Sequence, residues 1–92
     1  MKVKIRYCGQ LKQAAGCASE EVEPGGEPSV QDLIASVAAR HGDPLTGYLL
    51  DESGRLRATV LAFLNEEQVD WETARPLADG DELVFMSAIA GG

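Results

Sequence analysis

The sequence predicts a single α+β domain in which one sheet packs on one main helix. Three segments carry this prediction: an alternating stretch at Lys2–Tyr7, an amphipathic stretch at Ser29–Gly42 and an apolar run at Glu82–Ser87. The chain has 92 residues, and a domain of this size buries only about 60 to 68% of its unfolded surface. We therefore expect four to five short strands, one core and no second domain.

The first strand alternates charged and apolar residues, which is the period-two pattern of a strand with one buried face. Val3, Ile5 and Tyr7 are expected to point inward, and the cations between them outward. A helix of one or two turns is expected between Gly9 and Gly16, because good helix formers fill that interval and glycine commonly ends a helix.

An acidic, exposed strand is expected at Ser19–Glu23, where the carboxylates would protect a sheet edge from pairing with another chain. After a turn of prolines and glycines, the main helix begins at Ser29, which forms an approximate capping box with Asp32. It ends at Gly42. Apolar residues recur on one face of this helix, at Val30, Leu33, Ile34, Val37 and Ala38.

A long connection is expected from Asp43 to Arg57, with its leucines against the core. The strand at Thr59–Leu64 and the final strand are apolar on both faces. Either a second layer covers the outer face, or it forms an exposed apolar patch, which usually marks a protein contact site. The expected fold ends with a turn at Asn65–Glu67 and a brief return strand at Gln68–Asp70. Trp71 is expected to cover one end of the core.

No side-chain group for catalysis or metal binding is visible in the sequence. The single histidine, His41, lies in the last turn of the main helix, where positive charge suits the helix dipole. No cysteine or carboxylate beside it is expected to form a catalytic pair. Cys8 and Cys17 are too few to bind zinc or an iron–sulfur cluster, and we expect two free thiols. The sequence thus predicts no enzyme, no metal and no bound cofactor.

Charge and hydropathy limit the kinds of partner. The formal net charge of −7 argues against nucleic acid, because duplex binding depends on lysine and arginine contacts to phosphate. A basic protein surface is the more plausible partner. No apolar run approaches the roughly 20 residues of a membrane span, and the first residues lead into no signal-peptide core. We therefore expect a soluble, cytoplasmic protein with no membrane contact.

The order of the expected elements is that of the ubiquitin-like β-grasp fold. Leu77–Phe85 followed by Ile89–Gly92 resembles the end of small bacterial and archaeal sulfur carriers of the MoaD and ThiS type. Val3–Tyr7 and Leu50–Arg57 extend the similarity over nearly the whole chain. The resemblance implies that the first and last strands are parallel and adjacent at the sheet centre, with a β-grasp domain over residues 1–86 and a flexible tail over 87–92.

Carriers of this type lack a catalytic centre, and the resemblance implies that this chain is a substrate. The carboxylate of Gly92, preceded by Gly91, would be adenylated with ATP on a ubiquitin-activating-like adenylyltransferase. A persulfide sulfur donor would then convert it to a thiocarboxylate for an acceptor biosynthetic enzyme. Two glycines suit a narrow active-site channel. The implied role is the small subunit of molybdopterin synthase or a carrier in a related pathway, such as cysteine or thiamin synthesis.

Partner docking is expected on the outer sheet face. With Val3 and Ile5 inward, the outward neighbours include Arg6, Val84 and Met86. We nominate Met86 first, although methionine fills cores and interfaces alike, so ordinary core packing stays open. The expected contact set is Arg6, Val84 and Met86 from the strands with Ile89 and Ala90 from the tail.

Two other functions stay open at this point. One is a protein modifier that is joined to target lysines through Gly92, in which case purified adducts would carry an isopeptide remnant. The other is a non-conjugating ubiquitin-like adaptor with an incidental tail. Unchanged biological activity after deletion of Gly92 would favour this last function.

Overall fold

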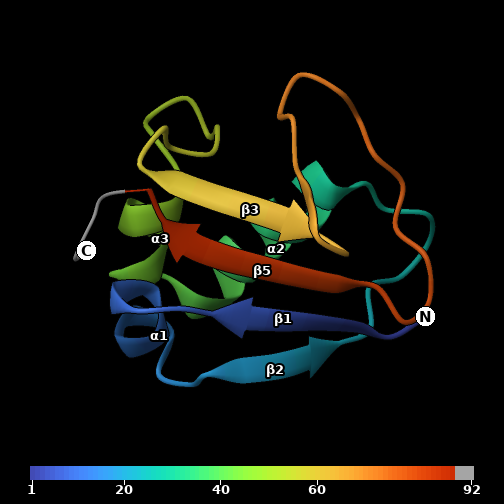
Figure 1. The fold of residues 1–92 in the computed structure, drawn as a ribbon, viewed down its shortest axis with the longest axis horizontal. Helices are drawn as coiled ribbons and strands as arrows, with labels where there is room; N and C mark the ends of the chain where they lie inside the picture. The colour runs from blue at the N-terminus through green and yellow to red at the C-terminus, as the bar shows by residue number, and fades with distance from the viewer. Residues whose placement is uncertain (89–92) are drawn as a thin grey trace.

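The last strand of the chain, β5 (Glu82–Ser87), lies at the centre of a five-stranded mixed sheet (Figure 1). The computed structural model describes residues 1–88 and has the strand order β2-β1-β5-β3-β4. β5 is parallel to β1 (Val3–Tyr7) and antiparallel to β3 (Val60–Leu64). The expected parallel pairing of the first and last strands is therefore confirmed.

The two edge strands are short. β2 (Ser19–Val22) pairs antiparallel with β1, and β4 (Glu67–Gln68) pairs antiparallel with β3. Between β3 and β4, Asn65 and Glu66 have φ angles of 50° and 74°, as a two-residue type I′ turn requires. Because this turn is one residue shorter than expected, the return strand begins at Glu67 rather than Gln68.

Three helices cover one face of the sheet, behind the strands in Figure 1. They are α1 (Gln10–Ala15), α2 (Val30–His41) and α3 (Leu45–Leu49). Between helices and sheet lies the core, whose largest fully buried side chains include Phe85, Ile5 and Ile34. Burying one such side chain stabilises the fold by about 1.5 to 3 kcal/mol.

α2 begins with a complete capping box. The Ser29 hydroxyl accepts a hydrogen bond from the Asp32 backbone N–H at 3.1 Å, and the Asp32 carboxylate accepts one from the Ser29 N–H at 3.0 Å. The hydrogen bond from the Ser29 N–H, and after it the nearby Ser29 hydroxyl, lower the pKa of Asp32, because they favour the ionised carboxylate. Two N–H groups without helical partners are thereby satisfied.

The segment from Asp43 to Arg57 contains a helix, α3, that the sequence did not predict. Leu45 and Leu49 lie one turn apart on α3, and both are fully buried. In the rest of this segment, Asp51 begins a turn in which its carboxylate accepts hydrogen bonds from two following backbone N–H groups. Trp71 packs against the core as expected.

None of the helices within residues 1–88 combines the length and the apolar character needed to cross a bilayer.

Candidate functional site

Four apolar side chains share the sheet face that the helices leave uncovered. Leu61 lies opposite Met86, and Phe63 lies opposite Val84, in the ladder between β3 and β5. All four are partly exposed, and we call them the outer apolar patch. Among residues 1–88, no second layer covers them, so of the two expected alternatives the apolar patch is the one observed.

Leu61 and Phe63 were not nominated as partner contacts from the sequence. The signal was present, because both alternate with buried residues along β3. What the residues alone could not supply was the pairing of β3 with β5, which places them beside Val84 and Met86. Met86 is neither buried core nor fully exposed, and the patch gives it apolar neighbours on the open face.

The outer apolar patch is hollowed on one side and bordered by charges. A depression of about 240 Å³ is lined by Phe63, Val84 and Met86 together with Glu66 and Glu82. On the other side of β5, the exposed cations of β1 run along the patch: Arg6 is in register with Val84, and Lys4 with Glu82. Lys4 has acidic neighbours on both sides, since Glu21 of β2 faces it as well, whereas Arg6 lies between Ser19 and Val84.

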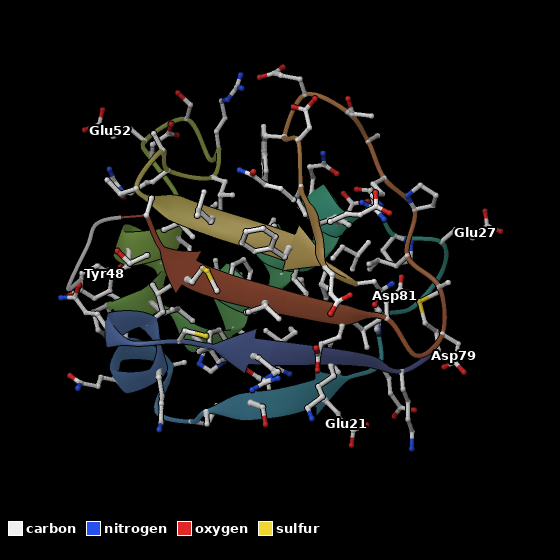
Figure 2. The ribbon with its side chains drawn as sticks, viewed as in Figure 1. Glu21, Glu27, Tyr48, Glu52, Asp79 and Asp81 are labelled. Carbon is white, nitrogen blue, oxygen red and sulfur yellow. The ribbon has the colours of Figure 1, made fainter. Side chains whose placement is uncertain are left out.

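β5 leads directly to the predicted reactive end of the chain. Its continuation is held at Ala88, whose N–H donates to the Thr59 carbonyl oxygen at 2.8 Å. A second hollow of about 230 Å³ borders this point, with the exposed Tyr48 on its rim (Figure 2). The predicted site residues Ile89, Ala90, Gly91 and Gly92 lie outside the described residues.

A carboxylate lies beside His41, in a contact that the sequence did not reveal. His41 Nε2 is 2.6 Å from Glu20 Oε2, and the Tyr7 hydroxyl donates to the same oxygen at 2.7 Å. Arg40 pairs with the other oxygen of Glu20. Pairing of β2 with β1 places Glu20 next to the end of α2, so the contact joins residues that are 21 positions apart.

The surroundings of Glu20 determine its ionisation. Burial raises the pKa of this carboxyl, but the hydrogen bonds from Tyr7 and His41 and the charge of Arg40 outweigh burial and lower the pKa overall. Burial also raises the pKa of Tyr7, and the neighbouring Glu20 carboxylate raises it further. Glu20 thus ties β1, β2 and α2 together through side chains, and its oxygens are used within the fold.

In the part of the chain that the structure describes, no three His, Cys, Asp or Glu side chains lie close enough together to hold a metal ion. Cys8 and Cys17 are free, partly buried thiols, which agrees with the expectation from the sequence.

Comparison with known proteins identifies the family. The model of the ThiS family matches residues 5–92. The molybdopterin synthase sulfur carrier subunit of Chlamydomonas reinhardtii is 28% identical over 92 residues, which is 100% of both chains.

Solved structures share the fold. SAMP1 from Haloferax volcanii has a TM-score of 0.87 at 22% identity and covers 100% of both chains. A putative molybdopterin converting factor, subunit 1, from Pyrococcus furiosus has a TM-score of 0.75 at 30% identity, over 97% of this chain and 99% of its own. The ubiquitin-like β-grasp fold is thereby confirmed. The chain belongs to the ThiS family, the ubiquitin-like sulfur carriers of the MoaD and ThiS type.

Proposed function

We propose that this chain carries sulfur as a thiocarboxylate on Gly92. The observation that carries the proposal is the family match over residues 5–92, which extends through Gly91 and Gly92. In support, β5 ends shortly before these glycines and is paired with a strand on each side. A tail that follows a central strand has a fixed starting point, which favours presentation of its end to an enzyme. The proposal requires a free carboxylate on Gly92.

The proposed activation takes place on a partner adenylyltransferase. An oxygen of the Gly92 carboxylate attacks the α-phosphate of ATP, and pyrophosphate leaves. The terminal sulfur of a persulfide donor then attacks the acyl carbon, and AMP leaves with the oxygen, which gives an acyl disulfide. A second thiol of the donor attacks the donor's sulfur in that disulfide, so that the thiocarboxylate leaves and the two donor sulfurs form a disulfide. The partner supplies the ATP site and the catalytic groups, while this chain supplies the carboxylate and the surface that docks. Small side chains next to the reacting carbon allow a close approach by the enzyme.

Docking in this proposal uses the outer apolar patch. Its partly exposed side chains lose water-accessible surface when a partner covers them, and this provides the main favourable term. Arg6 makes no ion pair within residues 1–88, so it is available to a partner carboxylate. We therefore propose a partner surface that is apolar at its centre, with an acidic residue opposite Arg6.

The acceptor that we propose first is the large subunit of a molybdopterin synthase. Both the Chlamydomonas reinhardtii protein and the Pyrococcus furiosus protein are named for molybdopterin formation. Enzymes of cysteine or thiamin synthesis are the alternative acceptors. Incubation of the thiocarboxylated chain with each acceptor, followed by a mass measurement of both product and carrier, distinguishes them.

Intact-mass spectrometry tests the activation step. The chain ending at Gly92 is incubated with ATP, a sulfide donor and each candidate adenylyltransferase. We expect replacement of one oxygen by sulfur with the cognate enzyme, and no change after deletion of Gly92. Gly25→Ala is the matched control, because a Cβ at Gly25 meets no atom within 4 Å. An unchanged mass with every adenylyltransferase would count against the proposal.

The same experiment separates sulfur transfer from protein modification. A carrier that joins target lysines leaves a C-terminal fragment of its own chain on those targets after proteolysis, held by an isopeptide bond. Such a remnant, formed in place of the thiocarboxylate and in the presence of ATP, would instead indicate a modifier.

A further inference from the structure

The outer side of β2 is an open sheet edge. Tyr7 N–H donates to the Ala18 carbonyl oxygen at 2.9 Å, and residues in an antiparallel ladder alternate in the direction of their backbone groups. Glu20 and Val22 therefore direct their N–H and C=O groups toward β1, while Glu21 directs its groups away from the sheet. No strand within residues 1–88 pairs with that outer side.

A hollow accompanies this edge on the helix side of the sheet. It has a volume of about 130 Å³ and lies between β2 and α2, with Val22 and Pro24 on one wall and Leu33 and Val37 on the other. Side chains of a strand alternate between the two faces of a sheet. A strand added beside β2 would therefore turn every second side chain toward the helices, where this hollow can receive an apolar one.

The charge of the edge restricts what can pair with it. Glu21 and Glu23 are exposed, and neither has an ion pair within residues 1–88. Arg40 lines the same hollow, but it is paired with Glu20. A second copy of β2 would bring carboxylates against carboxylates, and like charges that face each other across strands are destabilising. A strand with lysine or arginine at these positions would be attracted instead.

We propose that the outer edge of β2 binds a basic, extended segment of a partner protein as an added strand. Its main chain pairs with Glu21, its cations lie beside Glu21 and Glu23, and an apolar side chain enters the hollow between β2 and α2. This surface is distinct from the outer apolar patch on β3 and β5. A partner bound at β2 therefore leaves that patch open to an adenylyltransferase.

The proposal is tested by an NMR titration. The ¹⁵N-labelled chain is titrated with a synthetic peptide of alternating lysine and valine. We expect saturable shifts of the Ser19, Glu21 and Glu23 amide signals and slower hydrogen exchange at the Glu21 amide. A matched peptide with glutamate in place of lysine should produce neither effect. The test does not involve the tail, so it is independent of the result for Gly92.

Two substitutions at one position separate backbone pairing from charge. Glu21→Pro removes both the outward N–H group and the charge and leaves the bonds to β1 in place, so we expect affinity for the lysine peptide to fall at least about tenfold. Glu21→Gln keeps the N–H group and loses the charge, for which a loss of roughly two- to fivefold is expected. Glu52→Gln is the control, since Glu52 lies on a loop far from Glu21 in Figure 2, and it should bind like the wild type.

If Glu21→Pro prevents folding, Glu21→Lys provides the decisive variant, because it should reverse the preference and bind the glutamate peptide more tightly than the lysine peptide. Four results would overturn the proposal: no saturable shift, shifts confined to Val84 and Met86, equal affinity for both peptides, or unchanged binding by a folded Glu21→Pro variant.

Discussion

Met86 lies on the face of β5 that the helices leave open, opposite Leu61 and only partly exposed. Its thioether is flexible and polarisable, so it adapts to the shape of a partner surface. A carboxylate at this position would lose its hydration on docking without gaining a partner. We therefore expect the side chain at residue 86 to affect association more than folding.

The first prediction is that Met86→Asp raises the half-saturating concentration of the carrier for its adenylyltransferase by about tenfold or more. The free energy of unfolding should change by only about 1 kcal/mol, because the side chain is not fully buried. Steady-state kinetics and urea unfolding measure the two quantities. Ala35→Asp, on the exposed side of α2, is the control; a similar kinetic loss in this variant would argue against docking through the patch.

The second prediction concerns the pH dependence of stability through Glu20. Its pKa is lowered in the folded state from the ordinary value of 4.5, so the ionised carboxylate contributes stability above pH 4.5. That contribution is lost as the pH falls through the lower folded-state pKa. Glu20→Gln should therefore cost about 1 to 3 kcal/mol near pH 7, and the difference from wild type should shrink below pH 4.5.

Urea unfolding of both proteins at a series of pH values measures this difference. Glu21→Gln is the matched control, since Glu21 is exposed and has no ion pair within residues 1–88. A constant difference between wild type and Glu20→Gln down to pH 2 would contradict the prediction.

At the scale of the elements, capping hydrogen bonds fix the residue at which α2 begins. The third prediction is that Ser29→Ala lowers the free energy of unfolding by about 1 kcal/mol, because a capping hydroxyl satisfies one N–H group at the helix start. Ser36→Ala within the same helix is the control, and it should be neutral or slightly stabilising, because alanine is the better helix former. Urea denaturation resolves the two, and equal effects would indicate that the cap contributes nothing.

Elements with a strong periodic pattern were predictable from the sequence, whereas α3 was not. The alternation in β1 and the five-position apolar face of α2 each locate their element. α3 has only five residues, too few for a helix to form without tertiary contacts. Burial of Leu45 and Leu49 stabilises it instead, and that burial follows from the whole fold.

The candidate site was predictable to a similar degree. Residues on one strand, such as Val84 and Met86, are placed on a common face by alternation alone. Contacts between separate elements depend on topology, so the contact between Glu20 and His41 could not be predicted from the sequence. Leu61 and Phe63 joined the patch only once β3 was known to pair with β5.

At the scale of the whole molecule, the net charge of −7, from 8 basic and 15 acidic residues, opposes the compact state. The fourth prediction is that raising ionic strength from about 0.01 M to about 0.15 M at pH 7 raises Tm by a few degrees, because the screening length falls from about 30 Å to about 8 Å. Calorimetry measures the shift. Near pH 4.5, the isoelectric point, the effect should largely disappear, and a fall in Tm at pH 7 would contradict the prediction.

The central position of β5 also determines how the polypeptide reaches its native state. Lys4 pairs with Glu82 across 78 residues of chain, and β1 and β3 are joined in the sheet only through β5. Such a topology has a high contact order, which slows folding, because a long loop must close before the pairing becomes favourable. During translation, the antiparallel pairs β1–β2 and β3–β4 emerge without the strand that joins them. A product that stops before residue 82 therefore lacks the whole fold, not only its last strand.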